Sequence, residues 1–427
     1  MEFELLKETC TELKNNFLFQ ASLGSKELFH SNMLAWLLDQ PNENGKYEAL
    51  DTFLKQILKI PYSLDNQIGL YEIKREENKI DLIIKWEEEG TLKCIFIENK
   101  MKSIPDKSQL VKYDKKIDSR NNKSIRVGIN KLKQVNVKKI LLTPFPVDSG
   151  KFLTNSILKW ENISHKYEII NFLTQTKNIK FKNDKEKNVS FLIDKYLTFL
   201  ENQFSLLSIL NLDKINEENL FRKKYGFFYD ATLKNILTDV KLNDLVLKLF
   251  HDKIRLKLEN NILSTRPNID KRILRFYSGL SHETGITDIK ICISEQACQF
   301  ISIQLQAYDL KYGVEVIPLD KKNNEKFLEQ NKKYAEKLLK TNEVNFFDLT
   351  ILKGDGKEKE LKMEKNGKTI SFCSYSMKFI YLKRSITKEF KEKPIEELVS
   401  FISNETFKIL DNLIFYKKIF EEVSTND

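Results

Sequence analysis

Two acidic residues and a lysine stand out in a stretch of the chain that otherwise predicts buried strands. Residues 80–103 read IDLIIKWEEEGTLKCIFIENKMKS and contain Asp81, Glu98 and Lys100. An unpaired charge is costly inside a sheet, so acids at these positions need a partner. A divalent cation that prefers oxygen ligands, Mg²⁺ or Mn²⁺, would satisfy two neighbouring carboxylates. Such a cation polarises a phosphoryl oxygen and lowers the pKa of bound water, and the lysine could orient that water or stabilise transition-state charge.

A hairpin between the two strands would bring these side chains together. Glu89-Gly90 has the composition of a two-residue turn, in which glycine supplies the positive φ. The resulting register places Asp81 directly opposite Glu98, with Cβ atoms about 4.5–5.5 Å apart. Strand alternation puts Glu98 and Lys100 on one face and turns the side chain of Asn99 to the other. A purely structural alternative is a buried salt bridge between Asp81 and Lys100, with Glu98 capping a turn.

The flanking sequence predicts an α/β domain with a mixed sheet flanked by helices, followed by a second α+β domain. We expect the first domain over residues 1–210 and the second over 211–427. In the first, periodicity predicts helices over residues 2–20, 25–38, 47–60, 107–117, 166–174 and 188–209, and strands over 67–74, 79–86, 92–99 and 139–143. In the second, it predicts helices up to about 263, near 324–339 and from 394, and strands between 272 and 317 and over 344–352, 358–364 and 369–375.

Composition excludes several classes of protein. The 427 residues are 41% hydrophobic and 31% charged, which suits folded domains rather than a disordered chain. No run approaches the roughly 18 apolar residues of a membrane span, and the acidic start lacks the order of a signal peptide. The five cysteines are scattered, as expected of buried thiols in a reducing compartment. We therefore expect a cytoplasmic protein that does not associate with membranes.

A basic block follows the three candidate residues directly. Residues 100–139 contain thirteen Lys or Arg and three acids, whereas the formal net charge of the whole chain is +10. Such a block is usually a solvated face, but next to a hydrolytic site it favours a surface that binds phosphate groups. Lys102 and Lys112 are candidate substrate contacts within it. We expect nucleic acid, in particular DNA, as the partner. Backbone contacts carry no sequence information, so the basic block gives no ground for predicting sequence specificity.

Several motifs around the three residues form a recognisable set. A helix reading KELFHSNMLAWLLDQP places Glu27, His30 and Ser31 on one face. It precedes the strands NKIDLIIKW and CIFIENKMKS, the segment SQLVKYDKKI with Gln109 and Tyr113 four residues apart, and then KKILLTPFP and WENIS. Over residues 20–205 this order resembles the PD-(D/E)XK nuclease superfamily, specifically an uncharacterised bacterial branch with an E-x-x-H-S helix and a Q-x-x-x-Y element.

The resemblance implies a restriction-endonuclease-like fold and metal-dependent hydrolysis of phosphodiester bonds. It implies that Asp81 and Glu98 hold Mg²⁺ or Mn²⁺ together with the backbone carbonyl of Asn99. Lys100 would be the catalytic lysine, and Glu27 would add a further or water-mediated metal contact.

The resemblance also implies supporting roles for neighbouring residues. Gln109 and Tyr113 would support the lysine and contact the substrate strand. Ser31 shares the helix face with His30, which we expect to be a hydrogen-bonded residue near the site rather than a general base, because metal-bound water needs no strong base. His165 has no neighbouring Cys or His of the kind that a zinc site requires.

Other functions stay open at this stage. The chain could be a catalytically inactive nucleic-acid-binding or assembly subunit on a nuclease fold, although all motif residues are present. It could also act as an effector in bacterial anti-phage defence that requires a phage-derived trigger or a defence-system partner protein. A homodimer is a further possible assembly. Residues 211–427 could serve in recognition, dimerisation or sensing.

Overall fold

The computed structural model describes most of the chain as two compact units. It describes residues 2–21, 27–60, 71–77, 80–88, 91–101, 110, 113–115, 117, 135–146, 160–182, 184, 188–210, 231–270, 272–281, 284–317, 324–341, 343–354, 360–390 and 393–425. Unit 1 comprises Met1–Asp213 and Ile236–Leu242, and unit 2 comprises Lys214–Asn235 and Asn243–Asp427. No helix in these ranges is long and apolar enough to span a bilayer.

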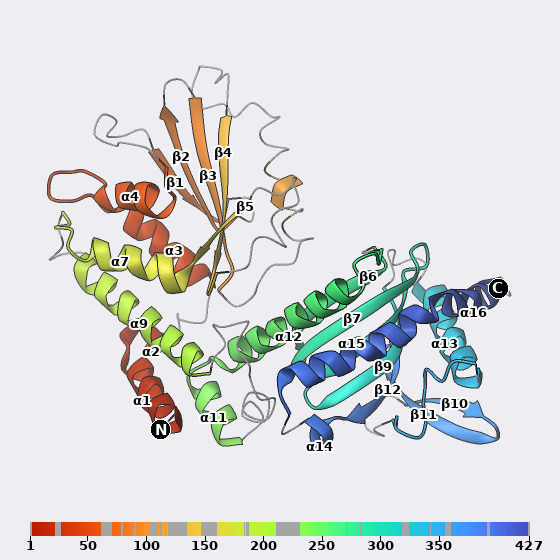
Figure 1. The fold of residues 1–427 in the computed structure, drawn as a ribbon. Helices are drawn as coiled ribbons and strands as arrows, with labels where there is room; N and C mark the ends of the chain where they lie inside the picture. Colours follow the sequence, from red (N-terminus) through yellow and green to blue (C-terminus); the bar gives the residue numbers. More distant parts are fainter. Residues whose placement is uncertain are drawn as a thin grey trace. The chain divides into compact units, whose positions relative to one another are not determined.

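Unit 1 is built on a mixed five-stranded sheet in the order β1-β2-β3-β4-β5. The first three strands pair antiparallel, and β3, β4 and β5 pair parallel. The strands are β1 (Tyr71–Arg75), β2 (Leu82–Glu88), β3 (Thr91–Asn99), β4 (Val135–Thr143) and β5 (Trp160–Ser164) (Figure 1). This is the expected restriction-endonuclease-like α/β architecture, in which β5 adds a strand that the sequence did not predict.

The hairpin of β2 and β3 has the register predicted from the sequence. Leu82 pairs with Ile97, and the ladder continues to Trp86 opposite Lys93. Asp81 and Glu98 are the next residues beyond the Leu82–Ile97 pair, at the end of the hairpin remote from the Glu89-Gly90 turn, which lies outside the described residues.

Helices flank the sheet of unit 1. They are α1 (Glu2–Asn15), α2 (Phe17–Gln20), α3 (Glu27–Leu38), α4 (Glu48–Thr52), η1 (Phe53–Ile57), η4 (His165–Ile169), α7 (Ile170–Thr176) and α9 (Val189–Ile209), where η1 and η4 are π-helical turns. The single helix expected over residues 2–20 is wrong, because Asn16 interrupts it. The Asn16 side chain accepts a hydrogen bond from the Leu18 N–H at 2.9 Å and so caps α2.

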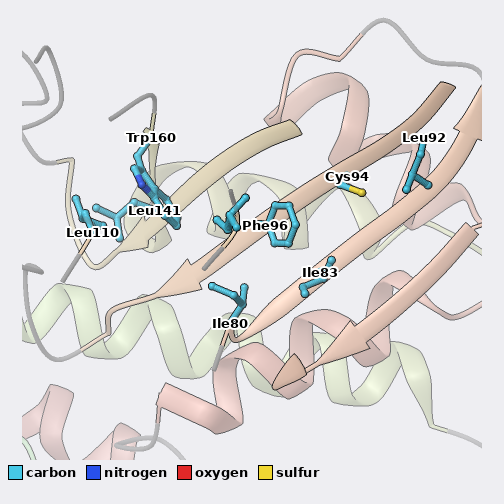
Figure 2. Packing of buried hydrophobic residues seen from close by; sticks show 9 residues of the cluster. Ile80, Ile83, Leu92, Cys94, Phe96, Leu110, Leu141 and Trp160 are labelled. Carbon is cyan, nitrogen blue, oxygen red and sulfur yellow. The ribbon is translucent and has the colours of Figure 1, made fainter. Parts of the chain in front are cut away.

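One face of the unit 1 sheet carries an apolar cluster (Figure 2). Ile83, Cys94 and Phe96 from β2 and β3 pack with Leu141 of β4 and with Leu110. Leu110 belongs to the segment 107–117 expected to be helical; residues 110, 113–115 and 117 are helical, and the rest of that segment lies outside the described residues. The cluster therefore fixes part of this segment against the same face of β3 that carries Glu98.

Unit 2 contains a seven-stranded antiparallel sheet in the order β10-β11-β12-β9-β8-β7-β6. Its strands are β6 (Leu274–Ser281), β7 (Thr284–Ser294), β8 (Gln299–Gln306), β9 (Asp309–Val316), β10 (Glu360–Lys365), β11 (Lys368–Tyr375) and β12 (Phe379–Ser385). Its helices are α12 (Asn243–Thr265), α13 (Asn324–Lys340), α14 (Thr387–Phe390), α15 (Ile395–Asp411) and α16 (Leu413–Ser424), and α11 (Ala231–Asp239) spans the division between the units. The α12 and α15 helices lie side by side along this sheet (Figure 1).

Hydrogen bonds show which face of the second sheet the helices cover. His251 of α12 bonds to Thr287 at 3.0 Å, and Tyr312 donates to Glu405 of α15 at 3.1 Å. Gly285 lies on the same face as Thr287, and a Cβ there would lie 2.0 Å from the His251 ring, so glycine permits the close approach of α12. The alternate residues of the central strands, which include Asp288 and Lys290, point to the opposite face.

The structure corrects two further expectations for unit 2. Residues 344–352 form turns rather than a strand, because the Asp348 side chain accepts hydrogen bonds from the N–H and the hydroxyl of Thr350 at 3.0 and 2.6 Å. The sequence did not predict β12, although it pairs with both β9 and β11. The Asn366-Gly367 turn does join β10 to β11, with φ of +51° and +71° as such hairpins require.

Candidate active site

Asp81, Glu98 and Lys100 converge where β2 begins and β3 ends. Lys100 Nζ lies 2.7 Å from Glu98 Oε1, and the Glu98 side chain is 2% exposed. Asp81 Oδ2 accepts a hydrogen bond from the Asn99 N–H at 2.7 Å. The ion pair is thus between Lys100 and Glu98, not between Lys100 and Asp81 as the salt-bridge alternative supposed. We call the face of the sheet that carries Glu98 and Lys100 the reaction face.

The surroundings of Asp81 disfavour its charged form. Burial, followed by the charge of Glu98, raises the pKa of Asp81 to about 6, and Glu27 adds to this effect. The Asn99 N–H and Lys100 act in the opposite direction. Asp81 therefore holds its proton more tightly than an ordinary aspartate, as expected where two acids lie close together in a buried place.

Lys100 stays positively charged in this environment. Burial lowers the pKa of Lys100, but the charge of Glu98 and its hydrogen bond outweigh burial, so the net pKa is raised. Lys100 Nζ also lies 5.9 Å from the centre of the Tyr113 ring. Burial and a hydrogen bond to Glu98 raise the pKa of Tyr113 to about 12, so its hydroxyl stays protonated. Both groups are hydrogen-bond donors rather than bases.

The carboxylates suit an oxygen-preferring cation with few protein ligands. Glu98 Oε2 is buried and has no hydrogen-bond partner among the described residues, so an acceptor is left for a ligand. Within those same residues, no group of three or more His, Cys, Asp or Glu side chains is placed to hold a metal. Asp81 and Glu98 would therefore share the cation with backbone, water or substrate oxygens, as is usual for Mg²⁺.

The side chain of Asn99 points to the opposite face of the sheet, which we call the support face. Its Nδ2 donates to the Glu27 carbonyl oxygen and to Ser31 Oγ, both at 3.1 Å. Its Oδ1 lies 2.9 Å from His165 Nε2. Asn99 thus joins β3 to α3 and to η4. Sequence reasoning considered only its backbone carbonyl, and it treated His165 as isolated because these two residues are 66 positions apart in the chain.

His30 is part of the packing on the support face. It is fully buried, and its Nδ1 lies 2.9 Å from the Tyr196 hydroxyl of α9. The rings of His30 and His165 are 5.5 Å apart, and burial together with His30 lowers the pKa of His165 well below its usual range. This location matches the expectation of a hydrogen-bonded helix residue near the site.

The remaining candidate residues divide into placed and unplaced groups. Glu27 is the first residue of α3, and its charge acts on both Asp81 and Lys100. Lys102, Gln109 and Lys112, with most of the basic block over residues 100–139, lie outside the described residues. At the end of that block, Lys138 pairs with Glu161 at 2.8 Å and Lys139 with Asp114 at 2.7 Å.

Comparison with known protein families is consistent with this geometry. Residues 15–198 match the family model described as the PD-(D/E)XK nuclease superfamily. The match supports the assignment of this region to the PD-(D/E)XK nuclease superfamily. The superfamily comprises nuclease-type phosphodiester hydrolases, which act on nucleic acid and generally use divalent metal ions. Searches among curated proteins and among solved structures each found no match to the chain.

Proposed function

We propose that the protein is a Mg²⁺-dependent nuclease that hydrolyses phosphodiester bonds in DNA, with Mn²⁺ able to replace Mg²⁺. The observation that carries the proposal is the convergence of Asp81, Glu98 and Lys100 on one side of a hairpin end. Glu98 has a buried carboxylate oxygen that no described residue hydrogen-bonds, and the pKa of Asp81 is raised; a metal site would explain both costs.

Each residue has a role that follows from its surroundings. Asp81 and Glu98 would hold the cation, with the Asn99 carbonyl as a third ligand and Glu27 as an outer or water-mediated contact. When bound, the cation supplies polarisation of a phosphoryl oxygen. Lys100 is kept charged by Glu98, so its ammonium can donate to the oxygens on which negative charge develops.

Substrate binding is proposed to involve the segment that follows β3. Tyr113 lies beside Lys100 and Glu98, and Gln109 and the lysines of the basic block, Lys102 and Lys112 among them, follow or precede it in sequence. Backbone contacts of this kind release counterions, so affinity for DNA should fall steeply as salt is added.

One assay tests the proposal. The full chain is incubated with linear, circular and single-stranded DNA and with RNA, in Mg²⁺, in Mn²⁺ and in chelator. Asp81→Ala and Lys100→Ala are expected to lose cleavage by about 10²–10³-fold while retaining salt-sensitive DNA binding. Cleavage that continues in chelator, or in either variant, would refute the assigned site.

The same hairpin offers matched controls. Lys93 and Glu88 form an ion pair of 3.4 Å near the turn end of β2 and β3, where their side chains are 26% and 34% exposed. Glu88→Ala and Lys93→Ala remove one acid and one lysine from the other end of the same hairpin and should cleave like wild type. Equal loss in all four variants would point to general damage to the hairpin.

Two alternatives are outcomes of this assay. Binding by the wild type with no cleavage under any metal would favour the inactive nucleic-acid-binding or assembly subunit. Toxicity in cells that depends on Asp81 and Lys100, without cleavage by the purified chain, would favour an anti-phage effector that needs a trigger or partner.

A further inference from the structure

The side chain of Asn99 has a hydrogen-bonding arrangement that fixes its orientation. The Glu27 carbonyl oxygen can only accept a hydrogen bond, so the Asn99 atom 3.1 Å away must be the amide nitrogen. Ser31 Oγ accepts from the same nitrogen at 3.1 Å and in turn donates to the Glu27 carbonyl at 3.2 Å. The amide oxygen of Asn99 is therefore the atom that faces His165.

This orientation determines where the proton of His165 resides. Asn99 Oδ1 is an acceptor, so His165 Nε2, 2.9 Å away, must carry the hydrogen. The other ring nitrogen, Nδ1, is unprotonated and has no hydrogen-bond partner in the described part of the chain. The hydrogen bond from Nε2 to Asn99 is thus the one that the His165 ring makes within the described residues, and it restrains the position of the Asn99 side chain.

Asn99 transmits this restraint to the reaction face through its backbone. Its N–H donates to Asp81 Oδ2 at 2.7 Å, and the next N–H, of Lys100, donates to the Leu142 carbonyl of β4 at 2.7 Å. Peptide units are planar and rigid, so a change in the side-chain anchor of Asn99 tilts both of these units. The side chains of Glu98 and Lys100 leave the chain on either side of Asn99.

We propose that His165 is a positioning residue for the nuclease site, acting through the Asn99 amide to orient Glu98, Lys100 and the Asn99 N–H that binds Asp81. The inference rests on the proposed function. Residues that orient metal ligands from behind commonly change metal affinity or activity by about 10–100-fold when replaced. Ser31 holds the opposite end of the same amide and should show the same effect at smaller size.

Unit 2 provides a matched control for the loss of a buried histidine. His251 is also fully buried, its Nδ1 bonds to Thr287 Oγ1 at 3.0 Å, and burial lowers its pKa to about 3. His251→Leu and His165→Leu remove the same ring from equally buried places. A purely structural role for His165 predicts that the two variants behave alike.

Two measurements on the full chain separate these cases. Mn²⁺ affinity is read from the free-ion electron paramagnetic resonance signal, and cleavage is read as separate kcat and KM values for DNA. His165→Leu is expected to weaken Mn²⁺ binding by about 10-fold and lower kcat by about 10–100-fold, with KM within twofold. His165→Gln, whose amide can still donate to Asn99, should recover most of both losses, and His251→Leu should show neither.

Each outcome decides the inference. Mn²⁺ binding and kcat that are equal in His165→Leu and His251→Leu would overturn it while leaving the proposed function standing. If His165→Leu does not fold, Ser31→Ala takes its place, with an expected loss of about 3–10-fold in Mn²⁺ affinity. If the wild type binds Mn²⁺ but does not cleave DNA, the comparison of Mn²⁺ affinities decides the inference. If the wild type neither binds Mn²⁺ nor cleaves DNA, both this inference and the proposed function are overturned.

Discussion

Unit 1 and unit 2 each contain two acids and a lysine on one face of a sheet, but the lysine forms different ion pairs in the two clusters. In unit 2, Lys290 lies in the middle of β7 and contacts both acids, with Nζ 3.3 Å from Asp288 Oδ2 and 2.6 Å from Glu315 Oε1. Ser302 donates a further hydrogen bond to Glu315 Oε2 at 3.0 Å. In unit 1 the lysine pairs with one acid and the cluster lies at a strand end.

The two clusters differ in their position along a strand and in how many acids the lysine contacts. In the middle of a sheet, neighbouring strands supply partners, so Lys290 can serve both acids at once. At the end of β2 and β3 the ladder stops, and Glu98 Oε2 is left without a partner among the described residues. Residue composition is the same in both places, and each cluster has one buried carboxylate oxygen without a hydrogen-bond partner among the described residues, Glu98 Oε2 in unit 1 and Asp288 Oδ1 in unit 2. The clusters differ in the lysine, because Lys290 contacts both acids whereas Lys100 is paired with Glu98.

The largest effect should come from removing one charge in each cluster. Glu98→Gln should reduce cleavage by about 10³-fold, because it removes a proposed metal ligand and the charge that holds Lys100 protonated. Glu315→Gln removes the equivalent acid of unit 2 and should change the initial rate by less than twofold. A comparable loss in both variants would break the distinction between the clusters.

Removing each lysine should distinguish the clusters by their response to metal. Lys290→Met leaves the buried Asp288 and the partly buried Glu315 without a cation and should lower the free energy of unfolding by about 3–5 kcal/mol. Lys100→Met should also destabilise, but Mn²⁺ can replace the lost charge there, so urea denaturation should show recovery when Mn²⁺ is added. Equal recovery of Lys290→Met by Mn²⁺ would contradict the assignment.

The raised pKa of Asp81 predicts that this residue lowers the free energy of unfolding, by an amount that depends on pH. Its pKa moves from 3.8 to about 6, so ionisation is disfavoured in the folded chain and stability is lost as pH rises from about 4 past 6. In chelator at pH 8, Asp81→Asn should therefore be more stable than wild type by about 1–2 kcal/mol, although inactive. The advantage should shrink towards pH 4, and denaturation midpoints across this range would check it.

The smallest effect is expected at the turn end of the same hairpin. The Glu88–Lys93 pair is partly exposed, so replacing Lys93 with Met should change the free energy of unfolding by less than about 0.5 kcal/mol. A thermal denaturation series that includes this variant sets the scale for the others. A cost above about 2 kcal/mol would show that ion pairs on this hairpin matter for folding wherever they lie.

The sequence predicted local pairing well because its determinants are local. The alternation of β3 and the position of Gly90 were enough to obtain the observed register of Leu82 with Ile97. The Asn366-Gly367 turn follows from the same kind of signal. The strand predicted over residues 344–352 is wrong. Its hydrophobic residues Phe346 and Phe347 are buried, but by a segment of turns that the Asp348 side chain stabilises.

The support face could not be predicted in the same way. His165 and Tyr196 meet α3 and β3 only because the chain folds back over 66 and 166 positions, and nothing in their own neighbourhood indicates it. The E-x-x-H-S motif itself contained a signal for this contact, because it places the Glu27 carbonyl oxygen and the Ser31 hydroxyl one helical turn apart. One amide group can donate hydrogen bonds to both, and Asn99, the middle residue of E-x-K, provides that amide.

The alternation of β3 limits how this strand can change in length. Glu98 and Asn99 are consecutive, and each is matched to a different side of the sheet. Inserting one residue after Cys94 would interchange the two sides, so that a carboxylate would be directed at His165 and an amide at the cation. Homologous chains should therefore differ here by an even number of residues, or carry a bulge that restores the phase.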